Sequence, residues 1–511
     1  MNPFESLIAA VAPRAALKRQ AARLQLEQLR RYDADARGRR VDGWGVRQTS
    51  ADSALGPEGG LKRERARDLV RNNPYAQRII QLWVDALVGH GWSFKAKAGR
   101  RNGGARGQRV TDEFRSWAAD PQQCDYEGLQ DLAGLIAKAV ACWKESGEVL
   151  IRWRTPSRAT IRRLGLRVPL QLQVMEPDWI DENHDTPAGE RGGYTKRGIV
   201  YDAEGKRESY WIYNYHPGES ALRAVSIESN TVPASQIIHL FTPKRPGQTR
   251  GATCLAPVVI ALRDLDDYLD AQLLKQKISA CMTGVIVDVD GAGDQKSDVG
   301  ERIEPGAMVR LGPGQDIRFS SPPSVGEIDK IMRGYLLRIA AGTNVPYELL
   351  TGDFQGTNFS AGRLGWQSFN KQTVSEQWQL LAPVMNRIWQ WFSAQTPTPT
   401  DGLSADWTPP PPQPYDPAAD TKATISKMRA GLKPPQEAIR EEGLEPDEVL
   451  EQYREWNAQL DAGGIVLDTD PRKVSAAGLT QARPIGSELP PTGEPPEEAT
   501  PPPQVTPAGE P

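Results

Sequence analysis

The stretch EIDKIMRGYLLRIAAG, residues 327–342, has the residue spacing of an amphipathic helix. Its apolar side chains recur at intervals of three and four residues, which places them on one stripe: Ile328, Ile331, Met332, Tyr335 and Ile339. Charged residues point in other directions, and Gly342 and Pro346 end the pattern. The stretch therefore predicts a helix that packs along one face.

A loop and a second long helix are expected after this helix. The loop TGDFQGTNFS, residues 351–360, holds two glycines and two phenylalanines, so it can bend freely and still present bulky side chains. Helical spacing resumes at Ala361 and continues to Phe392, with Pro383 as the expected site of a kink. Alone, this pattern is typical of a helix-loop-helix in an ordinary core. No catalytic set lies near it, which suits a moving part better than an active site.

The composition limits the classes of protein that this chain can represent. Its 511 residues are enough for several domains with a sizeable core. The sequence shows neither a membrane-spanning apolar run nor a secretory leader. A formal net charge of −3 argues against a protein that holds nucleic acid through its overall field. The four cysteines form no CxxC pair, and we expect reduced thiols in a cytoplasmic product.

The first half of the chain predicts a basic arm followed by an α+β domain. Residues 1–48 contain ten Lys or Arg against five Asp or Glu. This arm fits a solvated surface helix as well as a role in binding DNA or partners. A domain over 110–250 is expected to hold an antiparallel or mixed sheet. The expected elements are helices over 62–92, interrupted at 72–74, and over 128–146, and strands at 148–154, 170–176, 198–202 and 209–215.

The second half adds further helices and two compositionally biased segments, so the whole chain is predicted to be a mainly helical α+β protein. Residues 396–417 are a proline-rich connector that we expect to be extended, and 484–511 contain ten prolines and should be disordered. The other expected elements are a helix over 256–282, strand-like pieces at 284–291 and 307–314, and helices over 418–460 with a break at 431–435.

The sequence lacks common catalytic motifs, which predicts that the chain is not an enzyme. It has no GxxxxGK[ST] phosphate loop, no GxSxG elbow and no HExxH motif. The four histidines lack the spacing of metal ligands. The acidic stretch 175–185 could in principle bind a divalent ion, although a polar loop after a strand explains it better. We therefore expect no catalytic residues, no cofactor and no bound metal.

Several short motifs occur in order along the chain. They are DLVRNNPYA at 68–76, with Arg71, Asn72, Asn73 and Tyr75; LVG at 87–89; IIHLF at 237–241; GQTRGA at 247–252, with Gln248, Thr249, Arg250 and Gly251; LLRIAAG at 336–342; VPYELL at 345–350, with Pro346; and SAGR at 360–363. In this order, over about 60 to 395, they resemble the lambda-type portal proteins of tailed bacteriophages.

This resemblance implies a dodecameric ring at one capsid vertex, through which double-stranded DNA is packaged and later ejected. The implied partners are other copies of the chain, double-stranded DNA, the terminase large subunit, the major capsid and scaffold proteins, and head-completion or adaptor proteins. No membrane is involved, and the implied location is the virion, with the host cytoplasm during assembly. A channel that passes DNA quickly should not bind it strongly, which agrees with the small net charge.

The resemblance also assigns a part of the ring subunit to each segment. The segments are the basic arm 1–59, the α+β wing 60–255, the stem helices 256–283 and 324–345, the clip 284–323, the tunnel loop 346–360, the kinked wing helix with its connector 361–417, the helical crown 418–465 and the disordered tail 466–511. The residues implied to face DNA are Thr351, Gly352, Asp353, Phe354, Gln355, Gly356, Thr357, Asn358, Phe359 and Ser360.

Two alternatives to this interpretation remain open on the sequence. One is a different connector or adaptor ring of the virion. The other is a metal-dependent nuclease that uses the acidic stretch 175–185.

Overall fold

The computed structural model has a mixed α+β fold that is mainly helical, as the sequence patterns predict. It divides into two compact units, the first made of 1–91 and 96–405 and the second of 92–95 and 406–511. None of the helices among the described residues is long and apolar enough to cross a membrane. The structure describes residues 49–55, 59–98, 101–102, 104–189, 192–219, 228–280, 285–288, 315–318, 328–355, 359–412, 416–467, 470 and 472.

The first unit begins with helices α3 (Ala51–Leu55), α4 (Gly59–Asn72) and α5 (Pro74–Leu87). Asn73 separates α4 from α5 because its backbone is extended, and its side chain caps α5 by accepting a hydrogen bond from the Ala76 amide at 2.9 Å. Proline at the first position of α5 has no amide hydrogen to lose there. The interruption predicted at 72–74 is therefore a capped junction between two helices.

A three-stranded antiparallel sheet forms the centre of the first unit. Helix α8 ends at Gly147, whose φ of 92° is left-handed, and β3 starts at the next residue. Strand β3 lies between β4 and β9, and both pairings are antiparallel. The elements are α6 (Gly104–Ala119), α7 (Pro121–Cys124), α8 (Leu132–Ser146), β3 (Glu148–Arg154), α9 (Arg158–Leu164), β4 (Gln171–Met175) and β9 (Ile237–Phe241).

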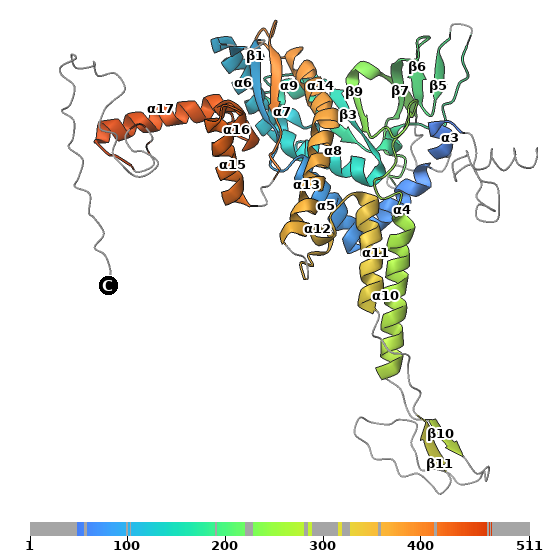
Figure 1. Cartoon of the computed structure of the whole chain (residues 1–511). Helices are drawn as coiled ribbons and strands as arrows, with labels where there is room; N and C mark the ends of the chain where they lie inside the picture. The colour runs from blue at the N-terminus through green and yellow to red at the C-terminus, as the bar shows by residue number, and fades with distance from the viewer. Residues whose placement is uncertain are drawn as a thin grey trace, which may run out of the picture. The chain divides into compact units, whose positions relative to one another are not determined.

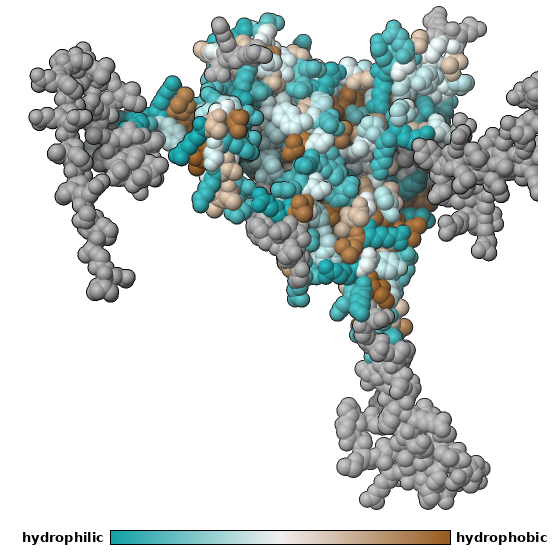
Figure 2. All heavy atoms as spheres, in the orientation of Figure 1, coloured by the Kyte–Doolittle hydropathy of each residue, from teal (hydrophilic) through white to brown (hydrophobic). Residues whose placement is uncertain are grey.

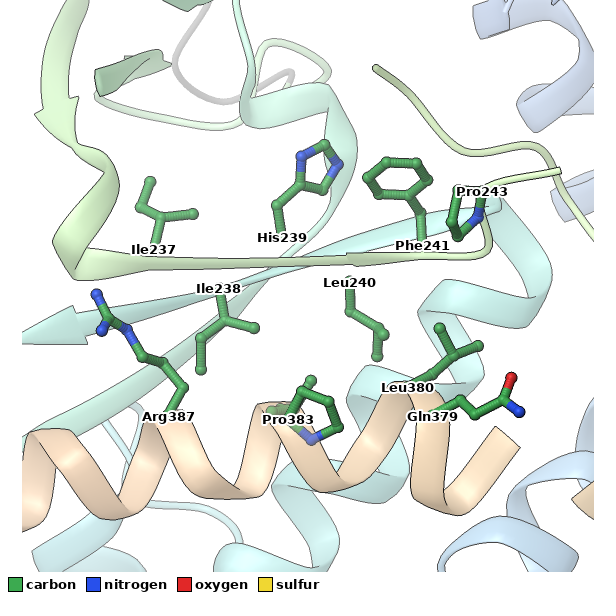
Figure 3. A pocket seen from close by; sticks show the side chains of 11 residues that line it. Ile237, Ile238, His239, Leu240, Phe241, Pro243, Gln379, Leu380, Pro383 and Arg387 are labelled. Atoms are coloured by element: carbon green, nitrogen blue, oxygen red, sulfur yellow. The ribbon is translucent and has the colours of Figure 1, made fainter. Parts of the chain in front are cut away.

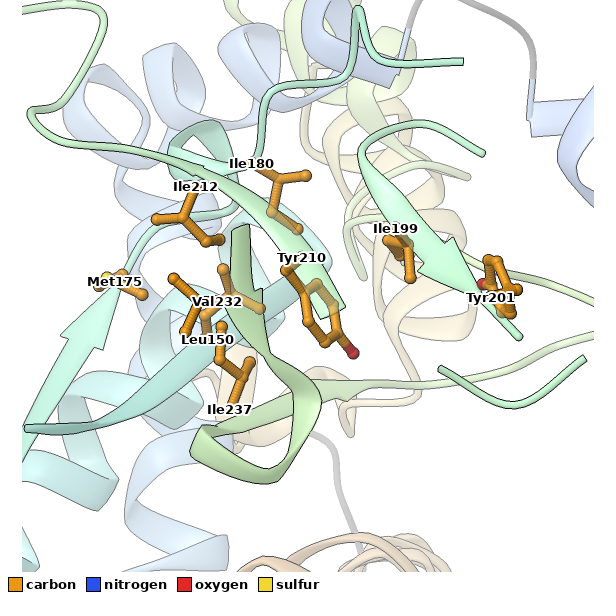
Figure 4. Close-up of a cluster of buried hydrophobic side chains, with 9 residues drawn as sticks. All are labelled: Leu150, Met175, Ile180, Ile199, Tyr201, Tyr210, Ile212, Val232 and Ile237. Atoms are coloured by element: carbon orange, nitrogen blue, oxygen red, sulfur yellow. The ribbon is translucent and has the colours of Figure 1, made fainter. Parts of the chain in front are cut away.

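A four-stranded antiparallel sheet packs beside the first sheet. Its strands follow chain order: β5 (Tyr194–Lys196), β6 (Ile199–Tyr201), β7 (Arg207–Tyr213) and β8 (Ser229–Pro233). The short helices η2 (Pro177–Trp179) and η4 (Ala234–Gln236) connect the two sheets. Figure 4 shows the buried cluster between them, which takes residues from both sheets: Leu150, Met175, Ile180, Ile199, Tyr201, Tyr210, Ile212, Val232 and Ile237.

Two long helices, α10 (Val259–Ala280) and α11 (Ile328–Thr343), run side by side in the first unit (Figure 1). Among the residues of α10 and α11 whose side chains the structure describes, those that are buried lie in the first turns of α10 and the last turns of α11. Strands β10 (Val285–Asp288) and β11 (Gln315–Arg318) form an antiparallel pair. The strand predicted at 307–314 lies outside the described residues, and β11 follows it in the sequence.

The long helix predicted after the loop consists of three consecutive helical segments. They are α13 (Phe359–Glu376), the π-helical turn η5 (Gln377–Leu381) and α14 (Ala382–Ser393). Pro383 stands in the first turn of α14, directly after the π-helical turn. A proline cannot donate a backbone hydrogen bond, and π-helical turns are a common way for a helix to accommodate such an interruption. At Pro383 the structure therefore has a change of helix type, and the kink predicted there stays a prediction.

The second unit is mostly helical. Its helices are α15 (Pro417–Arg429), α16 (Pro435–Glu441) and α17 (Pro446–Gly463), with the predicted break between α15 and α16. The connector predicted to be extended over 396–417 contains a strand, β12 (Ser404–Thr408). In the first unit, Lys97 and Ala98 at the end of strand β1 (Ser93–Ala98) pair antiparallel with β2 (Arg101–Asn102).

Candidate functional site

The first half of the loop 351–360 is an ordered turn at the end of a short helix, α12 (Tyr347–Thr351). Gly352 ends α12 with a left-handed φ of 70°. The side chain of Asp353 accepts hydrogen bonds from the Tyr347 hydroxyl at 3.2 Å and from the Gln355 amide at 3.0 Å. Phe354 is 65% exposed at the tip of this turn. The turn is thus held by hydrogen bonds while its one aromatic side chain faces solvent.

The loop predicted over 346–360 is partly helical in the structure. The sequence predicts a loop over 346–360, whereas α12 occupies its first part and α13 already starts at Phe359. Gly356, Thr357 and Asn358 lie outside the described residues, and so do the side chains of Phe359 and Ser360. The sequence predicts the next helix from Ala361, and α13 starts two residues earlier, a difference within the usual uncertainty of helix ends.

Helix α13 is anchored to α5 and α8 close to the π-helical turn. Glu376 at the end of α13 forms an ion pair with the buried Lys144 of α8. The Lys144 ammonium lies 3.9 Å from the ring centroid of Trp83, and that ring packs on Phe369 of α13 with 5.1 Å between centroids. Burial lowers the pKa of Lys144, and the charge of Glu376 opposes this shift. The helix that follows the loop is therefore fixed at its far end.

The motif DLVRNNPYA joins three helices. The amide of Asn73 donates hydrogen bonds to both carboxylate oxygens of Asp266 in α10, at 2.9 and 3.0 Å. Asn72 instead points to solvent and bonds Asp68 one turn earlier, at 2.8 Å. Arg71 is exposed and Tyr75 is half-buried. Asn73 is therefore the residue of this motif that ties the junction of α4 and α5 to α10.

The motif residues Gln248 and Thr249 hold the backbone of their own loop. The side chain of Gln248 accepts a hydrogen bond from the Lys244 amide and donates one to the Arg250 carbonyl, both at 2.8 Å. The Thr249 amide donates to Asp52 of α3 at 2.8 Å. Pro346 belongs to a separate place, the start of α12. The structure therefore does not bring all the motif residues into one site.

Arg250 lies at the centre of a buried cluster of ion pairs. Its Nε donates to both oxygens of Glu148, at 2.8 and 3.0 Å, and both residues are 1% exposed. Arg63 of α4 reaches the same Glu148 at 3.6 Å and also contacts Asp178 at 2.7 Å and Glu182 at 3.3 Å. Burial alone would raise the pKa of Glu148, but the Arg250 charge holds it well below its usual range. The cluster thus joins α4, β3 and the loop before α10.

A buried histidine extends this cluster. His239 of β9 contacts Glu148 through Nε2 at 2.9 Å and Arg207 through Nδ1 at 3.2 Å. An arginine can only donate, so Nδ1 must accept, and the ring proton is on Nε2, where it is donated to Glu148. Burial lowers the pKa of His239 to about 4, although Glu148 favours its charged form. The neutral imidazole therefore makes a hydrogen bond with Glu148 and no ion pair.

The acidic stretch 175–185 is balanced by protein cations. Glu176, Asp178 and His216 place one potential ligand atom each within 4.8 Å of one another. The guanidinium of Arg67 occupies this place from α4, at 3.0 Å from Glu176 and 2.6 Å from Asp178. Sequence spacing did not indicate Arg67 as a partner, because α4 lies more than a hundred residues earlier in the chain. The cluster is thus explained as an ion-pair site.

An apolar groove of about 330 Å³ runs between β9 and the junction of η5 with α14 (Figure 3). Ile238 and Leu240 point from β9 toward Pro383, while Arg387 and Gln379 lie at its two ends. Neither a nucleophile nor a metal-ligating set lines it among the described residues. The groove offers space without catalytic chemistry.

Comparison with known proteins gives a consistent result. Residues 37–377 match the family described as phage portal protein, lambda family. The chain is 25% identical over 469 residues to the probable portal protein of Halomonas phage phiHAP-1, covering 85% of this chain and 87% of that protein. It is 26% identical over 367 residues to portal protein B of Escherichia phage lambda, covering 64% of this chain and 67% of that protein.

Two solved structures resemble the chain at low sequence identity. One is a chain in the virion of a native gene transfer agent particle, with a TM-score of 0.46 and 17% identity, covering 80% of this chain and 98% of that chain. Another is an HK97 family phage portal protein from Corynebacterium diphtheriae, with a TM-score of 0.32 and 10% identity, covering 70% and 96%.

Proposed function

The chain belongs to the lambda family of phage portal proteins, and from this membership we propose that twelve copies close into a ring at one capsid vertex, the conduit for double-stranded DNA. The observation that carries the proposal is the family match over 37–377, which includes the sheet of β3, β4 and β9, the sheet of β5 to β8, α10, α11 and the loop after α12. A portal protein is a structural component of the virion and not an enzyme. This membership decides against the nuclease and against a separate adaptor ring.

The exposure of α10 and α11 supports a ring. Leu273 and Leu274 of α10 are 49% and 59% exposed, and Ile331 and Leu337 of α11 are exposed as well. In Figure 2 the coloured part of this helix pair is mixed, with hydrophobic side chains at a few places on its surface. A single chain does not bury them, whereas packing against the same helices of neighbouring copies would. We assign α10 and α11 to the stem of the ring.

The loop after α12 supports the conduit. Its described part presents polar groups and one exposed phenylalanine, with neither lysine nor arginine in 351–360 to grip phosphates. Double-stranded DNA can slide past such a surface because no strong charge pairs have to break. We assign 351–360 to the DNA-facing tunnel loop, from Thr351 to Ser360.

The remaining parts and partners follow the family arrangement. We assign 60–255 to the wing, 284–323 to the clip and 418–465 to the crown. The clip would contact the terminase large subunit during packaging and the head-completion proteins afterwards. The wing would contact the major capsid and scaffold proteins.

The oligomeric state of the purified chain tests this proposal. We expect light scattering to give the mass of a dodecamer and negative-stain microscopy to show perforated rings. A double substitution in the stem, Leu273→Asp with Leu274→Asp, should prevent ring formation because it places charge in the contact between copies. The matched control is Leu129→Asp, an exposed leucine outside the stem. A chain that stays monomeric under all assembly conditions would contradict the proposed ring.

A further inference from the structure

One segment of the wing is strongly basic although the whole chain is not. Between Arg152 and Met175 the sequence contains six arginines and neither a lysine nor an acidic residue: Arg152, Arg154, Arg158, Arg162, Arg163 and Arg167. The formal net charge of the chain is −3, so this excess is local. A basic stretch of this kind produces a positive field that distant acidic residues do not cancel, because salt screens them.

The fold presents this segment on a fixed support. Four of the arginines lie on or just after α9, which connects the neighbouring strands β3 and β4 (Figure 1). Ser157 caps the start of α9 by accepting from the Thr160 amide, and Gly165 ends it with a φ of 61°. Gln123 holds the end of the turn, accepting from the Arg167 amide at 3.1 Å. The arginines are therefore presented by an anchored connection between two strands.

The charge of these arginines is not neutralised within the described residues. Arg158, Arg162, Arg163 and Arg167 are exposed, and no carboxylate of the described part of the chain pairs with any of them. Arg152 and Arg154 on β3 are half-buried. Burial and the neighbouring Arg154 charge lower the pKa of Arg152 to about 10, as expected where positive charge accumulates.

We propose that α9 and Arg167 form a surface, here called the α9 surface, that binds the phosphate backbone of double-stranded DNA without reading its sequence. This site is separate from the tunnel loop and rests on the proposed function only in that DNA is the partner. Arginine suits phosphate because its planar fork donates two parallel hydrogen bonds. The surface has no carboxamide or carboxylate side chain among its exposed residues, so it lacks the side chains that read adenine and cytosine edges.

The exposed residues also favour DNA over an acidic protein. Protein interfaces bury an apolar centre, whereas the exposed residues of α9 are arginines and Ala159, and its larger apolar side chains are half-buried. Binding of nucleic acid through phosphates requires only clustered positive charge.

The test is the salt dependence of DNA binding by the full-length chain. A mixed-sequence duplex with a fluorescent label is titrated at salt concentrations from about 50 to about 200 mM. The variant carries Arg158→Gln, Arg162→Gln and Arg163→Gln. We expect weaker binding and a slope of log K against log salt that is shallower by about 0.9 for each lost phosphate contact. Replacing the same three arginines with lysine should preserve the slope.

The matched control removes the same charge elsewhere, with Lys422→Gln, Lys427→Gln and Arg429→Gln on the exposed surface of α15. Binding that is unchanged in the α9 variant, or reduced equally in the control, would overturn the proposal. Polyglutamate that competes as well as unlabelled DNA would identify an acidic protein as the partner instead and also overturn it. Light scattering distinguishes a failure of the α9 proposal from a failure of the proposed ring, because the α9 variant should still form rings.

Discussion

Gly251 shows how one residue fixes the loop before α10. A Cβ atom at this position would lie 2.1 Å from the carbonyl oxygen of Gly147. Both backbones are held, since the Gly251 amide donates to Glu148, the residue after Gly147. We expect Gly251→Ala to lower the free energy of unfolding by about 3 kcal/mol, measured by urea denaturation. Gly60→Ala is the control, because nothing lies within 4 Å of its added Cβ; equal stability of both variants would show that the contact is not limiting.

A second prediction at the scale of the residue concerns His239 and the dependence of the free energy of unfolding on pH. Its pKa is lowered from 6.5 to about 4 in the folded chain, so the unfolded chain binds the proton first as the pH falls. The contribution of His239 to the free energy of unfolding is therefore fully present above pH 6.5. It is lost as the pH falls from 6.5 to about 4. The loss should be about 3 kcal/mol.

Urea denaturation across this pH range measures the effect. His239→Gln keeps a side-chain donor near Glu148 but cannot titrate, so its stability should change less over the same interval. A variant that follows the pH profile of the parent would show that other groups cause the acid sensitivity.

At the scale of the element, Asn73 connects α4, α5 and α10. Replacing it with alanine removes the cap of α5 and both hydrogen bonds to Asp266. We expect Asn73→Ala to cost about 2 kcal/mol of unfolding free energy. The neighbouring Asn72→Ala removes one exposed contact and should cost less than about 0.5 kcal/mol. Equal losses in thermal or urea unfolding would contradict this division of roles.

Elements with local signals could be predicted from the sequence, and contacts between distant elements could not. The junction at Asn73 was visible because a capping residue and a proline stand together, and β3 was visible through its alternation. Helix α6 was not predicted, because its glycines and arginines obscure the apolar spacing. Arg63, Arg67 and His239 gave no signal as partners of Glu148 and Asp178, since they lie on α4 and β9. The motif around Arg250 resembles that of the portal family, but the sequence does not indicate that Arg250 pairs with Glu148.

At the scale of the whole molecule, the proposed conduit requires a weakly interacting channel surface on firmly held supports. The loop 351–360, which we propose as the tunnel loop, carries no positive side chain, whereas buried ion pairs join α8 to α13 and β3 to the loop before α10. If the proposed tunnel loop and the α9 surface both contact DNA, the two contacts differ in kind: transient at the loop and electrostatic at the α9 surface. This division agrees with a net charge near zero, because only a local patch has to be basic.

The tunnel loop yields the prediction that belongs to the assembled ring. Phe354 is exposed at the tip of a hydrogen-bonded turn, where loss of its ring should not affect folding. We expect Phe354→Ala, and Phe359→Ala beside it, to leave ring assembly intact and to impair packaging or retention of DNA. The measurement is the fraction of DNA-filled heads after packaging, with ring formation followed by light scattering. Leu129→Ala, an exposed apolar residue of the wing, is the control and should package normally. Full packaging and retention by both phenylalanine variants would remove the loop from the mechanism, because these are its only large apolar side chains.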